Sequence, residues 1–95
     1  MSAYRTHGRP GTSQNVAYTG TAGRIANVIS NDVFLVRVVL TTAGHIAIGL
    51  PSVVATTSDM YIPAGVPEYF AVRPGEKISA VRETSSGTMH VTEII

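Results

Sequence analysis

The stretch that decides the fold runs from Tyr61 to Val81 and reads YIPAGVPEYFAVRPGEKISAV. It contains Pro63, Pro67 and Pro74, which cannot donate a backbone hydrogen bond to a helix or to a strand ladder. The pair Pro74-Gly75 fixes φ at one residue and allows a positive φ at the next, as a tight turn requires. The stretch is therefore predicted to run strand, turn, strand, and to form the corner of a small β domain.

The clearest single strand is predicted at residues 33–40, VFLVRVVL, because it is rich in β-branched residues. The alternate side chains that begin with Phe34 are expected to line one face and to belong to the core. The opposite face is nearly as apolar, which favours a central strand that is buried on both sides or lies under a partner. Arg37 lies on that opposite face and would need an acidic or carbonyl partner there, because an unpaired buried charge is costly.

The rest of the chain is also divided into short strands by turn residues. Further strands are predicted near residues 14–19, 45–49, 60–62, 68–73, 76–83 and 88–95. The 45–49 strand is expected to form a hairpin with the 33–40 strand, and the last three strands are expected to form a meander. No stretch keeps a 3.6-residue period, so almost no helix is predicted. This pattern indicates an all-β fold, a small antiparallel β-sandwich or barrel of jelly-roll type.

Residues 1–23 are predicted to form an extended N-terminal arm, followed by a β-sandwich domain at residues 24–95. The first 31 residues carry Arg5, Arg9 and Arg24 and no acidic residue, so the arm is basic. One interpretation is a solvated, loosely ordered chain end. The other is that Tyr4, Arg5, Arg9 and Arg24 bind an acidic partner.

The composition favours a protein that is partly covered by another protein. Of the 95 residues, 44% are hydrophobic and only 14% are charged, whereas about a quarter of the residues in a typical soluble domain are charged. The chain lacks cysteine and tryptophan, which excludes a disulfide framework and a thiolate metal site. No signal sequence or membrane-spanning stretch is recognised, so synthesis in the cytosol and no membrane partner are expected.

No pattern of residues points to catalysis. His7, His45 and His90 are the available bases, but His90 and Glu93 are three apart on a predicted strand and would point to opposite faces. Neither a nucleophile elbow nor a phosphate-binding loop is present. We therefore predict a protein that is not an enzyme and that uses no metal or cofactor.

Nucleic-acid binding is a weaker interpretation of the basic arm. Tyr4 and Tyr18 lie among the basic residues of the first 24 positions, as aromatic residues do in single-strand binders. The aromatic residues of the predicted strands, such as Tyr69 and Phe70, instead lie in segments of low charge, and the body is mildly acidic. Binding to nucleic acid is not expected.

The last two thirds of the chain resembles a known group of proteins. The segments that carry the resemblance are TTAGHIAIG at 41–49, ATTSDMYIPAGVPEYF at 55–70, PGEKI at 74–78 and SGTMHVTE at 86–93. Over about residues 33–95 the chain resembles the small β-rich virion structural proteins of tailed bacteriophages, which are encoded among head genes and decorate or cement capsids. The arm carries no such resemblance.

The resemblance implies a non-enzymatic role on the capsid exterior of a virion assembled in the host cytoplasm. The expected partners are the major capsid protein and other copies of the chain, for example in a trimer, with Arg37, Tyr61 and Tyr69 as contacts on the body. An alternative is a fibre, spike or adaptor module that binds a host receptor or glycan through Tyr61, Tyr69 and Asp59. Deletion of residues 1–23 is expected to abolish capsid binding and to leave the β fold intact.

Overall fold

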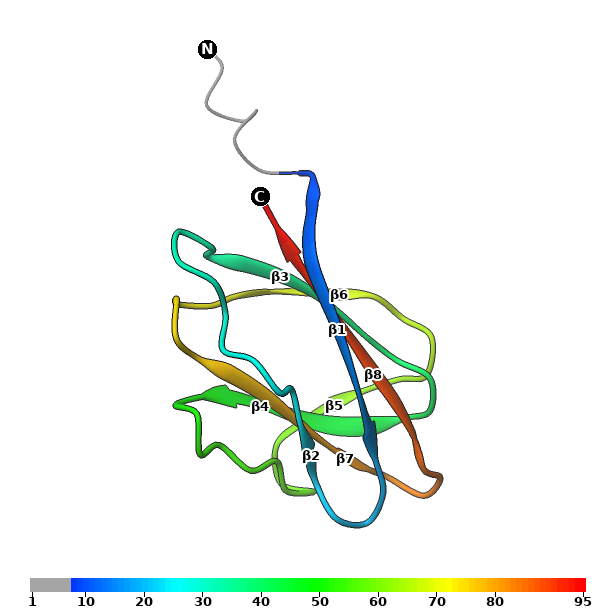
Figure 1. Cartoon of the computed structure of the whole chain (residues 1–95). Helices are drawn as coiled ribbons and strands as arrows, with labels where there is room; N and C mark the ends of the chain where they lie inside the picture. The colour runs from blue at the N-terminus through cyan, green and yellow to red at the C-terminus, as the bar shows by residue number, and fades with distance from the viewer. Residues whose placement is uncertain (1–7) are drawn as a thin grey trace.

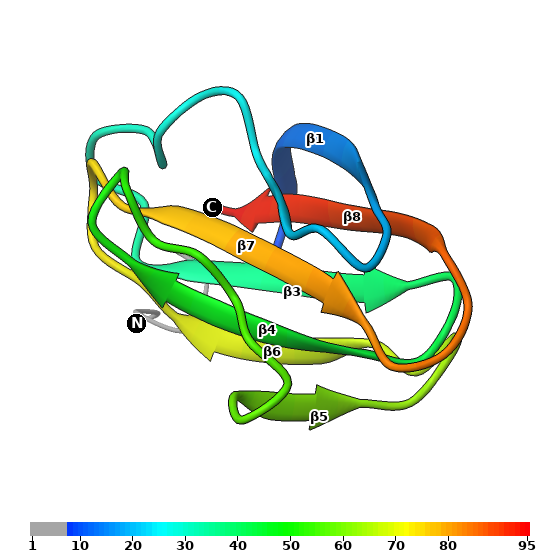
Figure 2. The same cartoon turned by 90° about the horizontal axis from the view of Figure 1, so that it is seen from below.

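Eight strands form two antiparallel sheets of four strands, which pack face to face (Figures 1 and 2). This computed structural model describes residues 8–95. Sheet A has the order β1 (Pro10–Tyr18), β8 (Gly87–Ile94), β3 (Leu35–Leu40) and β6 (Glu68–Ala71). Sheet B has the order β2 (Gly23–Arg24), β7 (Lys77–Arg82), β4 (Gly44–Gly49) and β5 (Met60–Ile62). The prediction of an all-β sandwich is confirmed.

Strands that follow one another in the sequence lie mostly in different sheets. The pairs are nested instead, because β1 pairs with β8, β2 with β7, β3 with β6 and β4 with β5. The predicted hairpin between residues 33–40 and 45–49 is wrong, and so is the predicted meander of the last three strands. The connections at residues 41–43 and 72–76 carry the chain from one sheet to the other. A turn sequence shows that the chain reverses, but not which strand it will pair with.

The core lies between the sheets and is built from alternate residues of the strands. On β3, Val36, Val38 and Leu40 are fully buried, and the strand is central in sheet A, as its sequence predicts. Phe34 was expected to continue this buried row, but its side chain is 51% exposed. The reason is that β3 begins at Leu35, so Phe34 lies beyond the end of the strand.

Strand β1 belongs to the sandwich, so the arm predicted at residues 1–23 does not match the structure over residues 10–18. This nine-residue strand is an edge of sheet A and pairs along its length with β8, with one bulge between Pro10 and Ser13. The Tyr18 side chain is 1% exposed, and its hydroxyl donates to the Thr42 carbonyl oxygen and accepts from the Thr42 backbone N–H at 3.2 Å. The polar sequence of β1 hides this role, since only one of its nine residues is deeply buried.

The Pro74-Gly75 turn is formed as predicted. Gly75 has a φ of 89°, which glycine adopts without steric cost. The backbone N–H of Glu76 donates to the Arg73 carbonyl at 3.2 Å. The turn joins β6 in sheet A to β7 in sheet B and so forms a corner of the sandwich.

Candidate interaction surface

The outer face of sheet B is covered by the chain itself. Residues 50–59, which connect β4 to β5, run across the outside of this sheet (Figure 2). The Ala55 N–H donates to Ser79 Oγ at 2.9 Å, and this hydroxyl donates to the Gly23 carbonyl at 3.0 Å. Ser79 and Val81 alternate with the core residues of β7, yet they are only 0% and 5% exposed. Sheet B therefore offers little of its outer face to a partner.

The outer face of sheet A is open, and the strand register places its side chains in rows. One row crosses the sheet through Ser13 on β1, Thr92 on β8, Arg37 on β3 and Tyr69 on β6. We call the open face around this row the Arg37 face. It consists of Ser13, Asn15, Ala17, Leu35, Arg37, Val39, Tyr69, Ala71, Thr88, His90 and Thr92.

The Arg37 face carries almost no charge. Tyr69 is 57% exposed, while Leu35 and Val39 are half-buried and flank Arg37 along β3. Arg37 and His90 are its only basic side chains, and no Asp or Glu belongs to it. The nearest acidic residues of these strands, Glu68 and Glu93, alternate with the outward residues and so lie toward the inside of the sandwich.

The partner predicted for Arg37 is not found among residues 8–95. No hydrogen bond or ion pair joins the Arg37 guanidinium to another side chain or carbonyl of this part of the chain. The residue is half-buried rather than buried, so water can solvate the charge and the cost that motivated the prediction is smaller. Arg37 remains the one guanidinium in the middle of an open sheet face.

Most of the side-chain carboxylates of the chain are engaged elsewhere. Four of them accept hydrogen bonds from other groups, and in three of these the donor is a backbone N–H. These are Asp59 with Thr56 N at 2.7 Å, Glu76 with Arg73 N at 2.8 Å, Glu93 with Ser30 N at 2.9 Å, and Glu83 with His45 Nε2 at 2.5 Å. Within residues 8–95, the His45–Glu83 contact is the only ion pair. The arginines of this part of the chain are therefore left without carboxylate partners.

The basic residues predicted to act together in the arm are not brought together where the structure describes them. Tyr4 and Arg5 lie outside the described residues. Arg9 is exposed just before β1 of sheet A. Arg24 lies on β2 of sheet B, where Nη1 donates to the Val53 carbonyl at 3.1 Å and helps to hold the loop over that sheet.

The two tyrosines predicted on the body lie on opposite sides of the molecule. Tyr69 belongs to the Arg37 face, directly across from Arg37. Tyr61 pairs with His45 in sheet B and points away from the core. The Asp59 carboxylate closes its own turn, where it accepts from the Thr56 N–H and hydroxyl. Tyr61, Tyr69 and Asp59 therefore do not converge on one receptor or glycan site.

His45 forms a polar cluster that the sequence did not reveal. It lies on the outside of β4 but is only 7% exposed. Its Nδ1 faces the Asp59 carbonyl at 3.0 Å, its Nε2 faces Glu83 Oε1 at 2.5 Å, and its ring meets the edge of the Tyr61 ring at 5.6 Å. Both nitrogens face acceptors, so the doubly protonated ring satisfies both contacts. The hydrogen bonds to Glu83 and to the Asp59 carbonyl raise the pKa of His45 above its usual 6.5, against an opposing effect of burial.

This raised pKa predicts that the stabilising effect of His45 depends on pH. The effect should be complete below about pH 6.5, the pKa in the unfolded chain, and should be lost as the pH rises through the higher pKa of the folded state. Because Glu83 is half exposed and screened by water, we expect only about 0.5–1 kcal/mol. Urea unfolding of the wild type and of His45→Gln should differ by this amount at about pH 6 and by less at about pH 9. An equal difference at both pH values would contradict the assignment.

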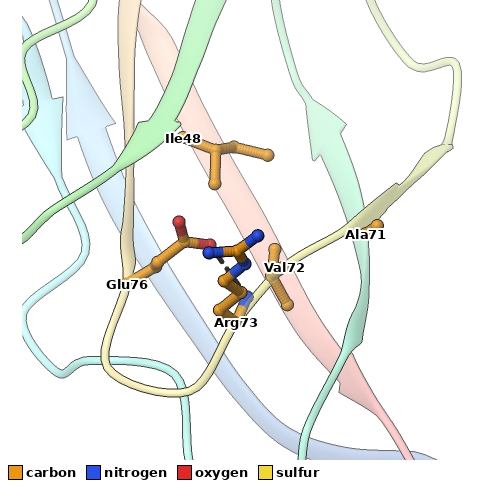
Figure 3. Close-up of a pocket in the computed structure, with 5 residues that line it drawn as sticks. All are labelled: Ile48, Ala71, Val72, Arg73 and Glu76. Carbon is orange, nitrogen blue, oxygen red and sulfur yellow. Dashed lines mark hydrogen bonds between the residues drawn. The ribbon is translucent and has the colours of Figure 1, made fainter.

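A pocket of about 360 Å³ lies at one end of the sandwich, beside the turn between β6 and β7 (Figure 3). Ile48, Ala71 and Val72 form its apolar wall, and Arg73 and Glu76 form its polar side. Glu76 is already bound to the Arg73 backbone N–H, so it closes the turn. The pocket contains no further titratable group, and we assign no chemistry to it.

The described residues contain no group of three or more His, Asp or Glu side chains arranged to hold a metal ion. No helix in residues 8–95 is long and apolar enough to cross a membrane. His90 and Glu93 point to opposite faces of β8, as their spacing predicts: His90 is exposed, and Glu93 is 3% exposed.

Sequence reasoning missed most of the Arg37 face. Alternation within the predicted strand at 88–95 does place His90 and Thr92 on one side. Nothing in the sequence shows that this strand lies between β1 and β3, which is what brings Thr92 beside Arg37 and within 3.0 Å of the Ser13 hydroxyl.

The comparisons with known proteins do not identify the chain. No protein-family model matches its sequence, and neither a curated protein nor a solved structure matches it.

Proposed function

We propose that the chain is a non-enzymatic structural protein of a bacteriophage virion, which binds the outside of the capsid as a decoration or cement protein. The observation that carries the proposal is the contrast between the two outer faces of the sandwich. One is covered by residues 50–59, and the other, the Arg37 face, is open. A module with one covered and one bare face can lie on a larger surface with the covered face outward.

The composition and the resemblance of residues 33–95 to virion structural proteins support this role. The strand order supports it too, because we infer from the nested pairs a jelly-roll topology. A jelly roll consists of two sheets that contain two Greek keys, and it occurs among viral capsid domains. In a jelly roll of eight strands, the first strand pairs with the last and the fourth pairs with the fifth, and successive pairs lie in alternate sheets. The chain shows this arrangement, since β1 pairs with β8 in sheet A and β4 pairs with β5 in sheet B.

The size of the Arg37 face favours binding in many copies. Four strands about 4.8 Å apart and about 20 Å long present roughly 400 Å². A stable one-to-one complex buries about 800 Å² on each partner. A single face would thus bind weakly, and repeated contacts on a shell, or contacts by residues 1–9 with the neighbouring subunit, would supply the rest.

The test is to mix the purified chain with heads from the phage that encodes it, before and after the bound copies are removed, and to count the copies that pellet. We expect the number of bound copies per head to saturate at a value that matches the icosahedral symmetry of the shell. We also expect stripped heads to regain their heat resistance. A handful of copies per particle, located on the tail, would instead support the fibre or adaptor alternative. Failure to pellet with the heads would overturn the proposal.

A further inference from the structure

We infer that the Arg37 face recognises a carboxylate presented by a different protein, and that Arg37 makes this contact. This inference deepens the proposed function and rests on it for the biological partner. It names the chemistry of the surface that the chain would bind: an acidic patch bordered by apolar and hydroxyl groups. The chain's own carboxylates leave the guanidinium free for such a partner.

The charge distribution favours a carboxylate from another protein as the partner of Arg37. Four of the six carboxylates of the chain bind a backbone N–H or His45. The other two, Asp32 and Glu68, do not belong to the Arg37 face, and residues 1–7 contain no acid. A carboxylate that binds Arg37 must therefore come from another molecule. A guanidinium binds carboxylates in a bidentate manner, which gives a contact both strength and direction.

The side chains around Arg37 also favour a contact with a carboxylate. It lies between Thr92 on β8 and Tyr69 on β6, with Leu35 and Val39 on either side along its own strand. When a partner covers these four side chains, it also removes water from the guanidinium. The attraction between the guanidinium and a carboxylate then becomes stronger. Thr92 and Tyr69 can supply further hydrogen bonds at the rim of the contact.

The same charge distribution argues against a second copy as the occupant. Two Arg37 faces packed against each other would bring together Arg37 and His90 from both copies, with no acidic residue on either side. Two guanidinium groups opposed in a desolvated contact repel each other strongly. Self-association of the chain would have to use another surface.

The experiment uses the full-length, ¹⁵N-labelled chain and a defined probe, a short peptide of alternating Glu and Ser, with Gln in place of Glu in the control peptide. The Glu peptide is expected to shift the Arg37 Nε–H signal and the amides of Thr92 and Tyr69, and added salt should weaken the binding. Arg37→Gln should reduce the affinity at least about tenfold, the loss expected for one charge-assisted hydrogen bond. Arg73→Gln, which makes the same change in charge in the pocket beside the turn between β6 and β7, should leave the affinity unchanged.

Other outcomes would overturn the inference. Equal shifts at all arginines, or equal losses in Arg37→Gln and Arg73→Gln, would mean that the peptide binds by net charge alone. Stronger shifts with an oligothymidylate of matched charge would assign the face to nucleic acid. If the Glu peptide binds at Arg37 but phage heads do not bind the chain, the inference stands and the proposed function fails. If heads bind wild type and Arg37→Gln equally, the proposed function stands and the inference fails.

Discussion

Deletion of residues 1–23 is expected to unfold the protein, in contrast to the expectation from the sequence alone. The deletion removes β1 and with it every backbone hydrogen bond that this strand makes to β8. It also removes Tyr18, whose buried side chain fills the core and binds the Thr42 backbone. Loss of one large core aromatic costs about 3–5 kcal/mol, and a small domain has only about 5–15 kcal/mol in total. Circular dichroism should show no cooperative thermal transition.

Deletion of residues 1–7 is the control, because it keeps the backbone hydrogen bond from the Gly8 N–H to the Ile95 carbonyl at 3.0 Å. This shorter deletion should keep the cooperative transition, with a Tm within about 3 °C of the full chain, since it leaves β1 and the core complete. A folded protein that lacks residues 1–23 would contradict the assignment of β1 to the sandwich. Binding by the arm should therefore be tested with the shorter deletion.

Substitution of Gly44 by alanine is expected to lower the stability of the fold strongly. A Cβ at this buried position of β4 would lie 2.6 Å from the Val81 carbonyl oxygen and 3.2 Å from Leu40 Cδ1. The carbonyl belongs to the neighbouring strand β7, so it cannot move without disturbing sheet B. We expect a loss of roughly 2–3 kcal/mol and a fall in Tm of roughly 10–20 °C.

Gly49→Ala on the same strand is the matched control. Its Cβ would lie 3.6 Å from Val53, an ordinary van der Waals distance. The substitution should therefore be neutral or should stabilise the chain by about 0.5 kcal/mol, because alanine restricts the unfolded state. Equal Tm values for the two variants in a calorimetric scan would show that the close approach at Gly44 is not a constraint.

The positions of strands could be predicted from the sequence where β-branched residues alternate strongly. Residues 35–40, 44–49 and 77–82 are strands in the structure. Phe70 and Tyr69 lie on the inner and outer faces of β6. β1 was predicted only in part, because hydrogen bonding to β8, rather than its own apolar content, holds it in place. Neighbouring strands were wrongly paired, since the choice between a hairpin and a crossing to the other sheet depends on how the whole core closes.

The candidate surface could be predicted only as separate residues. Arg37 was singled out as a charge on a strand with two apolar faces, and Tyr69 as an aromatic residue that could contact a partner. The structure places them directly across from each other. The acidic or carbonyl partner predicted for Arg37 is not found among residues 8–95, because the outer side of sheet A is open there. Tyr61 was grouped with Tyr69, but alternation along two strands of different sheets separates them. The His45 cluster depends on Asp59 and Glu83, which are remote in sequence and meet only in the fold.

The most direct test of the central claim is an electron cryomicroscopy map of decorated heads at a resolution that shows side chains. We expect the Arg37 face to lie against the shell, with a carboxylate of the capsid protein within hydrogen-bonding distance of the Arg37 guanidinium. Residues 50–59, which cover sheet B, should face the solvent. A map in which sheet B or its loop contacts the shell while the Arg37 face remains in solvent would contradict the account.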